Sequence, residues 1–156
     1  RQPAQLVAVA GRSGTRHHLF DSFAVGIQLA GVAPLMPATR ATVLFAHGSR
    51  DPAWSRPIEA VAQRMRALEP ACLVRCAYLE LTPPDLPTVV DALVAAGAQD
   101  IAIVPMFLGV GRHARQDLPE LVAQLGAAYP QHTIGLRPAI GEDARVIELL
   151  ARIALD

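Results

Sequence analysis

The sequence contains no lysine, because all fourteen of its basic residues are arginines. Schiff-base catalysis and Walker-type phosphate loops both need a lysine amine, so the sequence excludes both chemistries. Only two cysteines occur, Cys72 and Cys76, which excludes a disulfide-stapled scaffold and a cysteine-based zinc site. Fourteen acidic residues balance the arginines. A general nucleic-acid-binding protein normally shows a clear basic excess, so we expect no nucleic-acid partner.

Long apolar runs are also missing. The longest apolar stretch of the first forty residues, 23–36, is interrupted by Gln28, by two glycines and by Pro34. A membrane-spanning helix needs about 20 apolar residues in succession, so we expect no membrane partner. Hydrophobic residues nevertheless make up 52% of the 156 residues and charged residues only 18%, so the chain can bury a core. Length and composition together predict one compact domain in the cytoplasm.

The first forty residues differ from the rest in charge and pattern. They carry four arginines and one aspartate, a net charge of 4 − 1 = +3, whereas residues 41–156 carry ten arginines and thirteen acids, a net charge of −3. No hydrophobic period of 2 or 3.6 is sustained in this segment. Arginines ahead of an apolar run are also found in signal peptides, so this alternative interpretation of the segment stays open. We favour an irregular N-terminal extension over residues 1–40, with Met36 available as the natural first residue, followed by one domain over 41–156.

From residue 41 onward, strand and helix patterns alternate four times. Short apolar runs predict strands over 42–46, 72–79, 101–104 and 132–136. Helical spacing predicts helices over 54–68, 85–96, 115–128 and 142–154, with Ser55 and Gly97 in capping positions. This alternation is typical of an α/β domain in which helices flank an open, four-stranded parallel sheet with right-handed crossovers. The most favoured arrangement is flavodoxin-like.

Three polar residues follow the predicted strands. In an open parallel sheet, ligands bind outside the carboxyl ends of the strands, near the point where the strand order reverses. His47 follows the first strand, Glu80 follows the second, and His113 lies in the long turn predicted after the third. A flavodoxin-like order makes the first and third strands neighbours, so His47 and His113 would face each other with Glu80 beside them. Imidazoles and carboxylates bind cobalt, nickel or iron and also accept protons.

A purely structural interpretation competes with each of these assignments. A single histidine after a strand is more often a turn residue than a ligand, and a single glutamate is more often a solvated charge. Two histidines at the same sheet edge, both beside glycine-containing turns, make a functional role as reasonable as a structural one. His132, at the start of the fourth predicted strand, is expected to face solvent. Arg50, with two further arginines near residue 113, would suit a ligand that bears several carboxylates.

Three segments together resemble one known family. They are LFAHGSRDP (Leu44–Pro52), YLE (Tyr78–Glu80) and VPMFLGVGRH (Val104–His113). Residue types and spacing in these segments resemble those of the small single-domain sirohydrochlorin chelatases, which belong to the class II chelatases together with cobaltochelatase and ferrochelatase. The resemblance extends over residues 41–156 and has no counterpart in the first forty residues.

The resemblance implies a lyase that inserts a divalent metal into a tetrapyrrole without ATP. Cobalt is the most favoured metal, with nickel or iron as alternatives, and the pathway would lead to cobalamin or sirohaem. His47 and His113 would bind the metal and act with Glu80 in catalysis. The substrate would contact four further residues, namely Ser49, Arg50, Arg112 and Arg115. The metal would be a substrate, with no permanently bound cofactor, and the chain would form a homodimer.

Two other functions remain open from the sequence. A metallochaperone or tetrapyrrole carrier of the same fold would bind without turnover. A phosphate-handling enzyme is suggested by the segment Ala46–Arg50, because histidine phosphatases carry an Arg-His-Gly sequence. Here the residue before the histidine is Ala46 in place of arginine, which weakens the second alternative.

The N-terminal segment gives the first testable prediction. Residues 1–35 lack periodicity and lie outside the resemblance, so their deletion should leave the melting temperature of the protein nearly unchanged. Thermal unfolding of the full chain and of the deletion variant checks this. A melting temperature that falls by more than a few degrees would show that the segment packs on the core.

Overall fold

The computed structural model describes residues 39–156, with all side chains in that range except those of residues 112–114. The predicted extension therefore lies outside the described residues apart from its last two. Arg40 is already the first residue of a strand, so the domain begins slightly earlier than predicted. Gln99 supports this start, because its backbone N–H donates to the Thr39 carbonyl over 2.9 Å.

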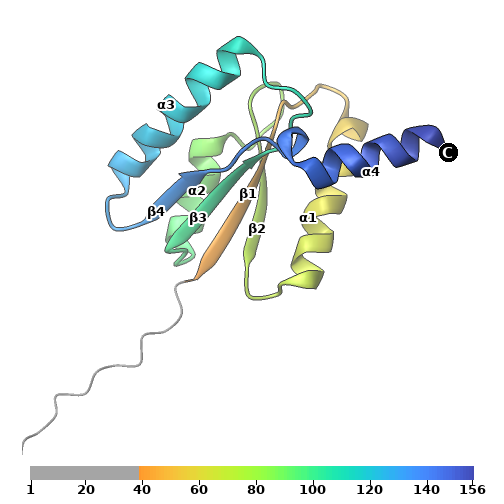
Figure 1. Cartoon of the computed structure of the whole chain (residues 1–156). Helices are drawn as coiled ribbons and strands as arrows, with labels where there is room; N and C mark the ends of the chain where they lie inside the picture. Colours follow the sequence, from red (N-terminus) through yellow and green to blue (C-terminus); the bar gives the residue numbers. More distant parts are fainter. Residues whose placement is uncertain (1–38) are drawn as a thin grey trace, which may run out of the picture. The chain divides into compact units, whose positions relative to one another are not determined.

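The domain is an open sheet of four parallel strands with helices on both faces (Figure 1). The strand order is β2-β1-β3-β4, so the first and third strands are neighbours as predicted. The strands are β1 (Arg40–Ala46), β2 (Leu73–Tyr78), β3 (Asp100–Pro105) and β4 (Thr133–Leu136). The helices are α1 (Arg56–Leu68), α2 (Leu86–Ala95), α3 (Arg112–Ala128) and α4 (Ala144–Leu155), with short 3-10 turns η1 (Pro52–Ser55) and η2 (Ile140–Glu142). The predicted fold class and element order are confirmed.

Alternate residues of β1 divide the core into two layers. Val43 and Phe45 point to the face that α2 and α3 cover, while Leu44 and Ala46 point to the face of α1. All four side chains are at most 2% exposed, because β1 lies between two strands and below helices on both faces. In α3, the predicted inward positions are buried or half-buried, namely Leu118, Leu121, Val122 and Leu125. The central strand is therefore the most completely buried element.

The start of the first helix differs from the prediction. Ser55 stands at the N-cap position of α1, but its hydroxyl donates to the Pro52 carbonyl over 3.2 Å and caps nothing in α1. The chain already turns at η1, where the Asp51 carboxylate accepts from the Ala53 N–H over 2.9 Å. Aspartate caps the earlier turn because its side chain reaches the free N–H groups that follow it.

His132 also differs from its prediction, since it does not simply face solvent. The ring is half-buried, and its Nδ1 lies 2.8 Å from the carbonyl oxygen of Ala98. The Tyr129 ring packs edge-on against it, with ring centroids 6.0 Å apart. These contacts give His132 a structural role in the turn that leads into β4.

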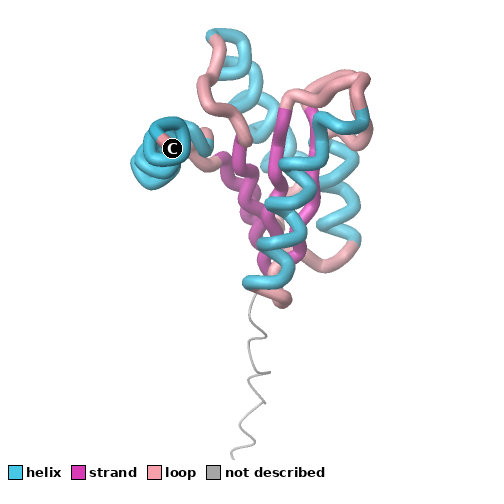
Figure 2. The backbone as a smooth tube through the Cα atoms, turned by 90° about the vertical axis from the view of Figure 1, so that its right-hand side faces the viewer, coloured by secondary structure: helices cyan, strands magenta, loops and turns pink. Residues whose placement is uncertain are grey.

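Helix α4 stands off the sheet (Figures 1 and 2). None of its residues is buried, and it contacts the rest of the domain mainly through η2. Its large apolar side chains are consequently exposed, among them Leu149 and Ile153, at 58% and 61%. No helix within residues 39–156 is both long enough and apolar enough to cross a membrane.

Two glycines give a matched prediction about stability. Gly97 follows α2 with φ at +87°, and Gly126 lies within α3, and a Cβ at either position would meet no atom within 4 Å. Gly97→Ala should cost about 1 kcal/mol because alanine disfavours the left-handed conformation. Gly126→Ala should stabilise by up to about 1 kcal/mol because alanine favours the helix. Urea unfolding of both variants checks the opposite signs, and a stabilised Gly97→Ala would contradict the capping role.

Candidate functional site at the carboxyl edge of the sheet

His47 and Glu80 lie side by side where two neighbouring strands end. His47 directly follows β1, and Glu80 lies two residues after β2. The parallel register continues beyond the strands, because the Leu79 N–H donates to the Ala46 carbonyl over 2.8 Å and the Glu80 N–H donates to the His47 carbonyl over 3.0 Å. Both side chains are exposed. Backbone hydrogen bonds thus place an imidazole and a carboxylate on adjacent chain segments at an edge open to solvent.

Gly48 permits this close approach of the two segments. Its φ is +93°, a conformation that residues with a Cβ rarely adopt. A Cβ on Gly48 would also lie only 1.9 Å from the carbonyl oxygen of Glu80 and 3.1 Å from its carbonyl carbon. Glycine is therefore required here for two independent reasons. The sequence offers a signal for this, a glycine directly after a strand and a histidine, but sequence reasoning assigned it no role.

Thr82 ties the two loops together and was missed by sequence reasoning. Its hydroxyl donates to the Ser49 carbonyl over 2.5 Å and accepts from the Ser49 N–H over 3.1 Å. The Ser49 hydroxyl in turn accepts from the Asp51 N–H over 3.1 Å. Ser49, predicted to bind substrate, is half-buried and holds its own loop in shape. The described residues thus show Ser49 in a loop-stabilising role.

Phe107 supports the ring of His47. The centroids of the two rings are 4.4 Å apart, with an interplanar angle of 37°. Phe107 is itself 3% exposed and packs edge-on against Phe45, so its position is fixed by the core. The Gly141 N–H donates to the Phe107 carbonyl over 3.0 Å, which holds the segment after β3 against η2. A buried aromatic residue therefore limits the orientations open to His47.

The position of His113 corrects the sequence prediction. We expected it in a long turn that ends at Arg115, but α3 begins at Arg112, so His113 is the second residue of that helix. The helix begins earlier because Gly111 has extended backbone and takes the N-cap position, and its carbonyl accepts from the Arg115 N–H over 3.1 Å. The side chains of Arg112 and His113 lie outside the described residues. Their predicted roles therefore remain predictions.

The other predicted arginines are exposed at the same edge. Arg50 lies in the loop after β1, and its side chain makes no hydrogen bond or ion pair with the described residues. The Arg115 Nε donates to the Val110 carbonyl over 3.0 Å, which leaves other guanidinium donors available. Both side chains could bind an anionic ligand that approaches the strand ends.

Burial raises the pKa values of two side chains of β2, close to this edge. Tyr78, the last residue of β2, is 4% exposed and its hydroxyl donates to Glu59 Oε1 over 3.0 Å. Burial raises the pKa of Tyr78 to about 12, and the hydrogen bond to Glu59 is the second cause of this shift. Burial likewise raises the pKa of the Cys76 thiol to about 12. Both groups stay protonated at neutral pH, so neither supplies a base to the site.

No group of three or more His, Cys, Asp or Glu side chains converges within the part of the chain whose side chains are described. His47 and Glu80 alone do not make a closed metal site, and the described geometry is that of an open edge. The two described cavities lie elsewhere. One, of about 330 Å³, is lined by residues from the amino-terminal parts of β1 and β3, and the other, of about 370 Å³, lies beside η2. Neither includes His47 or Glu80.

The fold and this edge together define an α/β protein that presents imidazole and carboxylate groups at the ends of adjacent parallel strands. A family model described as CbiX matches residues 41–155. The chain therefore belongs to the CbiX family. This confirms the resemblance from the three sequence segments.

Solved structures support the same assignment. A CbiX protein from Marinobacter aquaeolei VT8 is 31% identical, with a TM-score of 0.65, over 74% of this chain and 93% of that chain. The sirohydrochlorin chelatase SirB from Bacillus subtilis subspecies spizizenii, solved in complex with cobalt, is 30% identical, with a TM-score of 0.65, over 76% of this chain and 50% of that chain.

Among curated proteins, the sirohydrochlorin ferrochelatase of Bacillus subtilis strain 168 is 30% identical over 109 residues, which are 70% of this chain and 42% of the relative. The chain spans about half the length of the curated relatives that it matches first. The matched domain thus makes up nearly all of the Marinobacter chain and about half of the SirB chain.

Gly48 gives the prediction for this site. Gly48→Ala should lower the free energy of unfolding by at least about 2 kcal/mol, because it adds a left-handed alanine and forces the Glu80 carbonyl away. Gly109→Ala is the matched control, since a Cβ there would meet no atom within 4 Å. It should change stability by less than about 0.5 kcal/mol. Urea unfolding checks both values. Equal effects of the two substitutions would show that Gly48 is not needed for the close approach of the loops after β1 and β2.

Proposed function

We propose that the chain inserts a divalent metal, cobalt in the first place, into sirohydrochlorin. The observation that supports the proposal is the backbone pairing of His47 with Glu80, which brings an imidazole and a carboxylate to one open edge. Family membership and the relatives named as chelatases support the substrate class. The relatives point to two metals. SirB was solved in complex with cobalt. The curated Bacillus relative is named a ferrochelatase, so iron is the alternative metal.

Metallation requires that two pyrrole N–H bonds break while new metal–nitrogen bonds form. The reaction releases two protons, which need acceptors near the ring. His47 would hold the incoming metal with His113 and then accept a proton as the metal leaves for the macrocycle. Glu80 would accept the second proton and offset the positive charge that develops. Neither step requires ATP, because metal–nitrogen bond formation drives the exchange.

The substrate's peripheral carboxylates would meet the arginines of the same edge. Arg50 and Arg115 are exposed beside the strand ends, and guanidinium groups bind carboxylates with two parallel hydrogen bonds. Arg112 would join them from the first turn of α3. The exposed leucines Leu81 and Leu108, at 55% and 70%, would contact the apolar surface of the ring. Such an edge suits a large flat ligand with an acidic rim.

Histidine substitutions test this function. His47→Ala and His113→Ala should each lower the rate of cobalt insertion into sirohydrochlorin by roughly 10²-fold or more, because each removes a metal ligand or proton acceptor. The absorbance change of the tetrapyrrole measures the rate, and circular dichroism checks that each variant folds. His132→Ala is the matched control, because His132 bonds to the Ala98 carbonyl away from the edge and should keep the wild-type rate.

The same experiment separates a chelatase from a carrier. A carrier would bind the metal and the tetrapyrrole, but the metallation rate in its presence would be no higher than the rate in buffer alone. Full metallation by a folded His47→Ala, His113→Ala double variant would remove these residues from the mechanism. Acceleration by wild-type protein that is lost in both single variants and kept in His132→Ala is the result expected here.

A further inference from the structure

Leu81 has a backbone conformation that leucine rarely adopts. Its φ is +62°, and within residues 39–156 it is the one residue other than glycine with a positive φ. This conformation brings the Cβ close to the following carbonyl oxygen, so it is unfavourable for leucine. The side chain is also 55% exposed and belongs to neither layer of the core. Packing inside the domain therefore does not offset the unfavourable backbone.

This residue is the centre of a γ-turn that directly follows the edge described above. The Thr82 N–H donates to the Glu80 carbonyl over 2.7 Å, which closes a three-residue turn around Leu81. A γ-turn with positive φ at its central residue is the rare, strained form. Strained residues that the surrounding structure holds in place concentrate at ligand sites, so the turn is a candidate for a role in binding.

Thr82 holds the turn in this conformation. Its hydroxyl bonds to both backbone groups of Ser49, which fixes one end of the turn to the loop after β1. The other end is fixed by the Glu80 N–H, which donates to the His47 carbonyl over 3.0 Å. Leu81 lies between the two attachments. A change of its φ to a negative value would therefore displace at least one of them.

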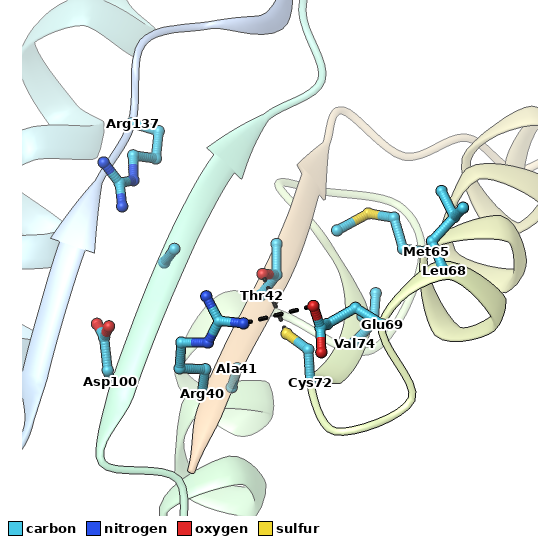
Figure 3. Close-up of a pocket in the computed structure, with 11 residues that line it drawn as sticks. Arg40, Ala41, Thr42, Met65, Leu68, Glu69, Cys72, Val74, Asp100 and Arg137 are labelled. Carbon is cyan, nitrogen blue, oxygen red and sulfur yellow. Dashed lines mark hydrogen bonds and ion pairs between the residues drawn. The ribbon is translucent and has the colours of Figure 1, made fainter. Parts of the chain in front are cut away.

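The turn lies at an open edge of the domain. The two described cavities do not include Leu81. The first, shown in Figure 3, lies against the amino-terminal parts of β1 and β3, and the second lies beside η2. Glu80 is exposed next to Leu81, and Arg50 is exposed in the loop to which Thr82 bonds. An apolar side chain thus accompanies a carboxylate and a guanidinium group, a combination that fits a ligand with an apolar face and an acidic rim.

We propose that Leu81 supports the apolar face of the tetrapyrrole, and that Thr82 is the positioning residue that keeps Leu81 in place before the ligand arrives. The inference rests on the proposed function, in which this edge receives sirohydrochlorin. A contact that is formed in advance leaves less to be ordered on binding. Stability of the fold and affinity for the ligand therefore make opposite demands at residue 81.

Substitution of Leu81 tests these opposite demands. Leu81→Asn should raise the urea midpoint of unfolding, because asparagine tolerates left-handed backbone. The same change should raise the Kd of metal-free sirohydrochlorin about fivefold or more, because the apolar contact is lost. Leu81→Met keeps an apolar side chain and should keep the Kd within about twofold. An absorbance titration measures the Kd.

The control removes an exposed apolar side chain elsewhere. Val61 in α1 is 40% exposed, and valine and asparagine have similar helix propensities. Val61→Asn should therefore leave both the Kd and the urea midpoint close to the wild-type values. A midpoint that falls in Leu81→Asn, or a Kd that stays at the wild-type value, would overturn the proposal.

A double-mutant cycle tests whether Thr82 acts through Leu81. Thr82→Val removes the hydroxyl and keeps the shape of the side chain, so it should raise the Kd about threefold. Thr82→Ser keeps the hydroxyl and should restore the wild-type Kd. In the Leu81→Asn chain, Thr82→Val should cause no further loss of affinity, because the contact that Thr82 positions is already absent.

The cycle also identifies a threonine that matters for stability alone. In that case Thr82→Val would lower the urea midpoint and leave the Kd unchanged. Equal losses of affinity in the two backgrounds would show that Thr82 acts independently of Leu81. Either result would overturn the positioning role.

Binding and metallation are measured separately, since the titration contains no metal. A chain that binds sirohydrochlorin through Leu81 but does not accelerate cobalt insertion would refute the proposed function and leave this inference standing. A chain that inserts cobalt, with a Leu81→Asn variant that binds sirohydrochlorin as tightly as the wild type, would have the opposite meaning. A wild-type chain that binds no sirohydrochlorin would overturn both.

Discussion

Hydrogen bonding of β1 to β2 on one side and to β3 on the other is the constraint on which the rest of the molecule depends. These pairings run the full length of β1, from Arg40 to Ala46. They divide the core into two layers and bring the chain segments that follow all three strands to one edge. Since His47, Glu80 and the segment before His113 follow these strands, the site is a direct consequence of strand order.

Much of the backbone arrangement at this edge of the sheet could be predicted from the sequence. Alternating apolar runs predicted four strands and four helices, and the neighbouring positions of β1 and β3 followed from the flavodoxin-like order. His47 and Glu80 could be placed because each directly follows or nearly follows a buried strand. Such predictions succeed where burial is nearly complete, since hydrophobic periodicity reports burial.

The remaining features depend on contacts between distant segments. No local pattern shows that Thr82 bonds to the Ser49 backbone, because the two residues are separated by 33 positions. The sequence likewise gives no sign that the ring of Phe107 packs against His47, because this contact joins the segments after two different strands. The start of α3 was missed because a glycine N-cap, without a side chain to bond, gives a weak signal. Helix α4 was predicted from its amphipathic pattern, which says nothing about which surface it covers.

The hydrogen bonds that join the two loops have a consequence for how this edge can change. Leu79 and Glu80 are held by their N–H groups to backbone carbonyls of Ala46 and His47, so these two contacts do not depend on which side chains the four residues carry. Gly48 is constrained by shape, and Thr82 is constrained by the hydrogen bonds of its hydroxyl to the Ser49 backbone. Exposed positions such as Arg50 and Leu108 are therefore free to vary while the scaffold persists. An edge of this kind can acquire a preference for a different metal or a differently substituted ring through surface substitutions alone, with the fold left intact.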